Sequence, residues 1–127
     1  MKRGAALYTA YAREIATPEA AVLPLHEQLV RSVLIAWQAI SDKDFPLAHG
    51  HLLAAQEVLL VLAKNAEADR SFAGSENLAG LYEWCRDELV AANLQKDAAQ
   101  LAPVVEVLSG VRDAFVEGLQ AHTAGGR

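Results

Sequence analysis

The chain of 127 residues has one cysteine, few aromatic residues and no dense cluster of basic residues. The single cysteine, Cys85, excludes an internal disulfide, and its place on an apolar helical face predicts a small buried side chain. Eleven basic against sixteen acidic residues leave a net charge of −5. This balance disfavours general nucleic-acid binding, because phosphate neutralisation requires clustered Lys or Arg.

Two further absences concern cellular location. No basic-then-apolar leader pattern begins the chain, and we find no apolar run of the ~20 residues that span a bilayer. We therefore expect a cytoplasmic protein without membrane insertion.

The motifs of common enzyme and metal sites are also missing. There is no P-loop, dinucleotide-binding glycine motif or G-x-S-x-G sequence. His49 and His51 are two residues apart and diverge on a helix, and the Glu-x-x-His pairs of a di-iron bundle do not occur. We predict no enzyme activity, no cofactor and no metal site. Surface or boundary positions are predicted for all four histidines, His26, His49, His51 and His122.

Apolar residues spaced by three and four positions are the main structural signal, and they predict helices over about 17–40, 44–64, 75–93 and 97–119. Thr17 is a good N-cap with Pro18 at the first helical position. Asp44 and Asp97 are placed to cap the second and fourth helices. Pro24 predicts either a bend in the first helix or a start after it.

No strand pattern of convincing length is present. The short connections at 41–44 and 93–97 make neighbouring helices antiparallel. We predict an all-α fold, an antiparallel four-helix bundle over 17–122. A short N-terminal helical or capping segment over 1–16 precedes it, and a disordered tail over 123–127 follows.

Gly50, Gly80, Gly110 and Gly118 fall inside the predicted helices, where each costs ~1 kcal/mol relative to alanine. For each alone, close helix packing or a fraying end is the simpler explanation. For the four together, the alternative is that they permit close approach of a partner helix or make the bundle more flexible.

The apolar faces of the first two long helices are wider than a single core seam. Uncovered apolar strips of helical width dock amphipathic partner segments. Complete burial in the bundle, or a homodimer, explains the same pattern equally well. The residues that widen these faces, and that we predict to bind a partner, are Leu23, Val30 and Leu34 on the first helix and Leu53, Leu60 and Val61 on the second.

The segment 77–97, NLAGLYEWCRDELVAANLQKD, combines an amphipathic helix with the pattern LY-x-W/Y-x-x-x-x-L-x-x-AN followed by Lys-Asp. Other segments match the same family in order and spacing: Tyr8-Thr9-Ala10-Tyr11, Ala16-Thr17-Pro18-Glu19, Asp42-Lys43-Asp44-Phe45, and Leu108 with Val111-Arg112-Asp113-Ala114-Phe115. Together they resemble the cytosolic flagellin export chaperones, the FliS family, over most of the chain.

The resemblance implies a chaperone that binds the disordered C-terminal part of flagellin, which wraps around the bundle as helices. Such binding blocks premature filament assembly and keeps the client competent for the type III export gate. It involves no nucleotide and no chemistry. The family's N-terminal tyrosines, matched by Tyr8 and Tyr11, cover part of the apolar groove until the client displaces them. The implied partners are flagellin and export-gate components, with the chaperone as a monomer or homodimer.

The chain departs from the family pattern at His26-Glu27-Gln28, where a Tyr-Asp-Gly-like triplet is usual, and at Phe115, where tryptophan is common. These departures leave the identity of the client open. Two alternatives also remain open: a structural or regulatory bundle that binds another amphipathic partner or itself, and a small-ligand-binding bundle.

Overall fold

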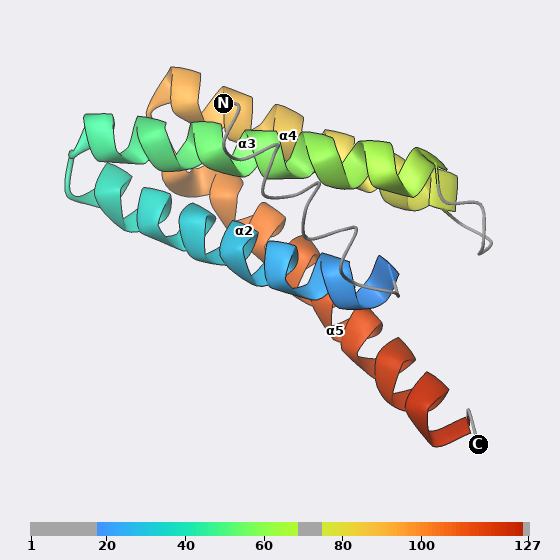
Figure 1. Ribbon diagram of the computed structural model, residues 1–127. Coiled ribbons are helices and arrows are strands. Elements are labelled where there is room, and N and C mark those ends of the chain that lie inside the picture. Colours follow the sequence, from blue (N-terminus) through green and yellow to red (C-terminus); the bar gives the residue numbers. More distant parts are fainter. Residues whose placement is uncertain (1–17, 69–74, 126–127) are drawn as a thin grey trace.

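Figure 1 shows the computed structural model, which describes residues 18–68 and 75–125. These residues form only helices: α2 (Pro18–Ser41), α3 (Phe45–Ala68), α4 (Ser75–Gln95), the 3-10 helix η1 (Ala98–Gln100) and α5 (Leu101–Gly125). The predicted all-α fold and the order of the helices are confirmed.

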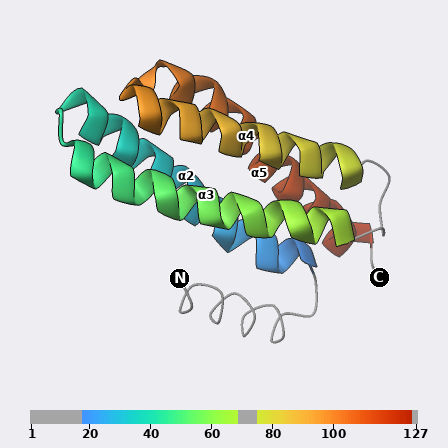
Figure 2. The same ribbon diagram turned by 90° about the horizontal axis from the view of Figure 1, so that it is seen from above.

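The helices run antiparallel to their sequence neighbours (Figures 1 and 2). α3 packs against both α2 and α4, whereas α5 packs mainly on α2 and makes few contacts with α4. The end of α5 extends beyond the other helices (Figure 1). The packing is therefore close between α2 and α3 and between α3 and α4, and it is looser between α4 and α5.

Two short turns of the same construction connect α2 to α3 and α4 to η1. Lys43 and Lys96 adopt the left-handed backbone conformation, with φ of 61° and 56°. The N–H groups of the following residues, Asp44 and Asp97, donate to the carbonyls five positions earlier at 2.8 and 3.3 Å. This is a Schellman-type helix end, in which glycine usually occupies the left-handed position.

Each of these aspartates also begins the next helix. The Asp44 carboxylate accepts the Leu47 N–H at 3.3 Å, and the Asp97 carboxylate accepts the Ala99 N–H at 2.9 Å. These bonds satisfy N–H groups that the first turn of a helix leaves without partners. The cap predicted at Asp44 is confirmed, whereas Asp97 caps the 3-10 helix η1 and the fourth long helix begins after it, at Leu101.

Leucine and alanine dominate the core. Ala36, Ala55 and Ala92 are completely buried, so their small side chains allow the helices to approach closely. Cys85 is also completely buried, as predicted, and burial raises the pKa of its thiol to about 12. The largest fully buried side chains include Tyr82, Leu29, Leu52, Leu59, Leu62, Leu89, Leu101 and Leu108.

The structure decides the open question at Pro24, and two helices end later than expected. α2 begins at Pro18 and continues through Pro24, so a start after Pro24 is wrong. Pro24 is exposed, and without an N–H group it makes no bond to the carbonyl four positions earlier. α3 continues to Ala68, past its expected end, because Ala66 extends the buried seam and is only 4 % exposed. At the other end of the chain, the backbone of α5 reaches Gly125, within the predicted tail.

The three helical glycines with described surroundings do not lie at close helix contacts. A Cβ atom added at Gly50, Gly80 or Gly110 would meet nothing within 4 Å. The packing explanation is therefore wrong for these three positions. Gly118 lies in α5 beyond the residues whose surroundings are described.

Among the described helices, α3 alone is long and apolar enough to cross a membrane by length and composition, with a mean hydropathy of 1.3 over an 18-residue window. The expectation that no segment reaches this limit is wrong for α3. Inside the bundle, the apolar residues of α3 divide between two faces. One face packs in the core between α2 and α4, and the other exposes leucines to solvent.

Candidate functional site

The residues predicted to bind a partner are partly exposed wherever the structure describes them. Leu34, Leu53 and Leu60 are 47 %, 42 % and 40 % exposed, which is high for leucine. Tyr8 and Tyr11 lie outside the described residues. The remaining three, Leu23, Val30 and Val61, are half-buried.

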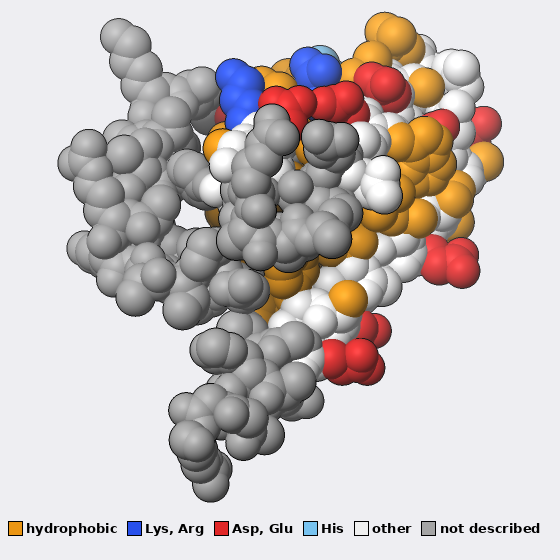
Figure 3. Space-filling view, turned by 90° about the vertical axis from the view of Figure 1, so that its right-hand side faces the viewer, with side chains coloured by type: hydrophobic (Ala, Val, Ile, Leu, Met, Phe, Trp, Pro, Cys, Tyr) orange, Lys and Arg blue, Asp and Glu red, His pale blue; other side chains and the backbone are white. Residues whose placement is uncertain are grey.

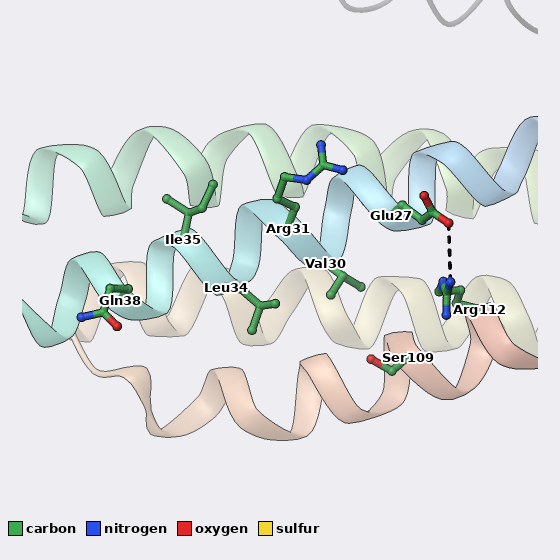
Figure 4. A pocket seen from close by; sticks show the side chains of 8 residues that line it. All are labelled: Glu27, Val30, Arg31, Leu34, Ile35, Gln38, Ser109 and Arg112. Carbon is green, nitrogen blue, oxygen red and sulfur yellow. Dashed lines mark ion pairs between the residues drawn. The ribbon is translucent and has the colours of Figure 1, made fainter.

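A shallow groove of about 560 Å³ runs along the outer side of α2 beside α5 (Figure 4). We call it the α2 groove. It brings together two of the predicted residues, Val30 and Leu34, with six others. It is lined by Glu27, Val30, Arg31, Leu34, Ile35 and Gln38 from α2 and by Ser109 and Arg112 from α5.

Helix periodicity separates the side chains of α2 into two flanks. Val30 and Leu34 are four residues apart and point towards α5 (Figure 4). Arg31 and Ile35, also four apart, point towards α3 (Figure 4). The groove therefore has an apolar strip on its α5 side and a strip with one cation on its α3 side.

An ion pair joins α2 to α5 at one end of the groove. The Arg112 Nη2 atom lies 3.6 Å from Glu27 Oε1, and Arg112 Nη1 lies 3.2 Å from Asp113 Oδ1. The Arg112 and Glu27 side chains are 41 % and 53 % exposed, so solvent screening limits the pair to ~1 kcal/mol or less. For Arg31, by contrast, the described part of the chain provides no ion pair or hydrogen bond.

A buried polar contact lies on the core side of α2. His26 is completely buried, and its Nε2 atom is 2.6 Å from the Tyr82 hydroxyl of α4. Burial lowers the pKa of His26 to about 4, and the backbone of Leu108 has a smaller, opposite effect. The ring is therefore neutral near pH 7, and its Nε2 atom shares a hydrogen bond with the Tyr82 hydroxyl. The prediction of a surface or boundary histidine is wrong for His26.

The two departures from the family pattern meet at this contact. The His26 ring lies 5.8 Å from the Phe115 ring and 5.4 Å from the Tyr82 ring, centroid to centroid. Burial also raises the pKa of the Tyr82 hydroxyl, so it remains a hydrogen-bond donor. Three helices, α2, α4 and α5, are thus joined by one aromatic cluster, in which His26 and Tyr82 are buried and Phe115 is half-buried.

The outer side of α3 carries a second exposed apolar strip, which we call the α3 face. Leu53 and Leu60 are seven residues apart, two helical turns, and therefore lie on one side. Glu57 and Lys64 are exposed on the same side. Apart from the α3 face, Figure 3 shows apolar side chains gathered on the right of that view, with acidic groups around them. Surfaces of this composition are typical of protein–protein contacts.

Nothing in the described part of the chain gathers three or more His, Cys, Asp or Glu side chains in a way that could hold a metal ion. The α2 groove offers apolar contacts, one unpaired cation and exposed hydrogen-bonding groups. Its chemistry suits binding of a chain segment.

The prediction from sequence identified the apolar side of the groove and missed its polar side. Arg31 and Gln38 are on a predicted helix, but nothing in their spacing distinguishes them from other solvated residues. Ser109 and Arg112 come from α5, and the register of α5 against α2 cannot be read from the chain. Arg112 does belong to one of the motifs that carry the family resemblance.

Comparison with known proteins gives the family. The model of the family described as flagellar protein FliS matches residues 1–122. The chain is also similar to the flagellar secretion chaperone FliS of Bacillus subtilis (strain 168), with 29 % identity over 127 residues that cover 94 % of each chain. With a match over nearly its whole length, the chain belongs to the flagellar protein FliS family.

Proposed function

We propose that this protein is a cytosolic flagellar secretion chaperone that binds the disordered C-terminal segment of flagellin. Binding prevents premature polymerisation and keeps the client competent for export. The observation that carries the proposal is the set of exposed leucines, Leu34, Leu53 and Leu60, on adjacent helices of a FliS-family bundle. The flagellar role of the relative supports it.

The exposed surfaces suit a client that folds on binding. A disordered segment loses conformational entropy when it becomes helical, so its affinity has to come from extended apolar contact. The α2 groove and the α3 face provide two such strips on neighbouring helices. A segment that wraps around the bundle can contact both.

The N-terminal residues complete the proposal. Residues 1–16 act as a capping segment whose Tyr8 and Tyr11 cover part of the apolar surface until the client displaces them. Deleting residues 1–15 should then raise client affinity. Unchanged affinity with a lower melting temperature would mean that the segment is a permanent part of the core.

The protein works in the cytoplasm without catalysis and without a cofactor. It is a monomer or homodimer, and it delivers the client to export-gate components. The alternative is a structural or regulatory bundle that binds another amphipathic partner or itself through the same surfaces. The two functions differ in their client, so a flagellin assay separates them.

The test is calorimetric titration of the protein with a C-terminal flagellin fragment from the same organism at several temperatures. We expect one-to-one binding with a large negative heat-capacity change, because apolar surface is buried. Far-ultraviolet circular dichroism should show a gain of helix in the complex. In a parallel assay, an equimolar amount of the protein should suppress polymerisation of full-length flagellin, measured by light scattering. No binding by a well-folded protein would remove the flagellin assignment.

A further inference from the structure

The α2 groove contains a cation without a counter-ion beside its apolar strip. Two arginines and one glutamate line the groove. Arg112 is already near both Glu27 and Asp113, whereas Arg31 has no ion pair or hydrogen bond within the described part of the chain. The positive charge that remains available is therefore the guanidinium of Arg31, in a protein whose net charge is −5.

We propose that the α2 groove receives an amphipathic helix that packs apolar side chains on Val30 and Leu34 and pairs one acidic side chain with Arg31. This inference rests on the proposed function and specifies the chemistry of the flagellin segment that enters this groove. The strip and the cation lie on opposite flanks of α2 (Figure 4). A helix lying along α2 therefore presents the carboxylate on the flank that faces α3.

The dimensions of the groove set the length of its occupant. Its α2 lining extends from Glu27 to Gln38, a rise of about 16 Å at ~1.5 Å per residue. About three helical turns fit this distance. Val30 and Leu34 are one turn apart, so the occupant needs apolar residues spaced by three or four positions.

The charge of Arg31 determines which kind of charged residue the bound helix carries at the facing position. A carboxylate beside a guanidinium forms two parallel hydrogen bonds with a fixed geometry, so an acidic residue at that point aligns the helix in the groove. A lysine or arginine there would be repelled. Client recognition by this groove therefore combines apolar contact with selection against basic residues at one position.

The test compares charge reversal at Arg31 with the same reversal elsewhere. The full-length protein carrying Arg31→Glu is titrated with the C-terminal flagellin fragment at low and high salt. Lys43→Glu is the matched control, because Lys43 is exposed in the α2–α3 turn outside the groove. We expect Arg31→Glu to weaken binding about five- to tenfold, Arg31→Gln about two- to fivefold, and Lys43→Glu less than about twofold. High salt should reduce the effect of Arg31→Glu, since the pair is partly exposed.

A client scan identifies the acidic partner. Each Asp or Glu of the fragment is replaced by Lys in turn, and one replacement should weaken binding to the wild type and restore binding to Arg31→Glu.

Failure of every replacement to do so, or equal affinities for Arg31→Glu and wild type, would overturn the inference while leaving the proposed function intact. Tighter binding by Arg31→Glu would overturn it in favour of the chain's own N-terminal segment as occupant. Dissociation of a homodimer by the variant, seen by sedimentation, would overturn it in favour of a second copy. If the wild type does not bind the fragment, the proposed function fails and this inference fails with it.

Discussion

Acidification should destabilise the bundle through one buried side chain, His26. Burial lowers the pKa of this imidazole from 6.5 to about 4, because the charged ring would lose its hydration. In the unfolded chain the ring is in water and is protonated below about pH 6.5. Between these two values the unfolded state binds one more proton than the folded state. The free energy of unfolding therefore falls as the pH falls through this window.

The size of the loss follows from the two pKa values. Each unit of difference corresponds to ~1.4 kcal/mol. With pKa values of 6.5 and about 4, stability relative to pH 7 drops by about 2 kcal/mol at pH 5 and about 3 kcal/mol at pH 4. Since domains of this size have a total stability of ~5–15 kcal/mol, urea unfolding can resolve the change.

The assay is urea unfolding followed by circular dichroism at pH 7 and pH 5 for the wild type and His26→Gln. Glutamine does not titrate, and its amide oxygen can accept the Tyr82 hydroxyl in place of Nε2. Other groups that titrate in this range do so in both proteins and cancel in the difference. The wild type should lose about 2 kcal/mol more than the variant between the two pH values.

Equal losses in the two proteins, within about 0.5 kcal/mol, would refute the argument from burial. A second measurement does not depend on the variant. The ring proton resonances of His26, followed by NMR in the folded protein, should stay at their neutral positions down to about pH 5. A midpoint near 6.5 in the folded state would contradict the structure.

Four further predictions concern single sites. Tyr82→Phe should lower the free energy of unfolding by about 1–2 kcal/mol, because buried His26 loses its hydrogen-bond partner; a neutral effect in urea unfolding would mean that the bond contributes nothing. Lys43→Gly should raise stability by about 0.5–1 kcal/mol, since glycine adopts φ of 61° without strain, and a loss would contradict the turn geometry. Gly80→Ala should raise the melting temperature, because its Cβ meets nothing within 4 Å and alanine favours the helix by ~1 kcal/mol; a lower melting temperature would reveal an unseen clash. Cys85 should react with a thiol reagent only as fast as the protein opens, since its thiol is buried with a pKa of about 12, and rapid labelling of the native protein would show that it is accessible.

The main features of the fold could be predicted from the sequence because they depend on local signals. Apolar spacing located the helices, and Asp44 and Asp97 marked two helix starts. Those two caps are short-range interactions with residues three or two positions away. The end of α3 was missed because it depends on Ala66, an alanine whose burial against the core is a tertiary effect.

The candidate site could be predicted only in part. Leu34, Leu53 and Leu60 are predicted to bind a partner because they widen an apolar face beyond one buried row, and all three are exposed. The role of His26 was misjudged, since its burial depends on Tyr82 of α4, 56 positions along the chain. The unpaired state of Arg31 likewise depends on which side chains surround it in three dimensions.

The most direct test of the proposed function is the affinity of the C-terminal flagellin fragment for three versions of the protein. These are the wild type, Leu34→Asp in the α2 groove, and Leu94→Asp as a control at a leucine that is 79 % exposed on α4 outside the groove. We predict tight one-to-one binding by the wild type and the control, and a loss of at least about tenfold for Leu34→Asp, because burying a carboxylate against apolar surface costs more than ~1.4 kcal/mol. Absence of binding by the folded wild type, or equal affinity of all three proteins, would contradict flagellin binding through the outer face of α2.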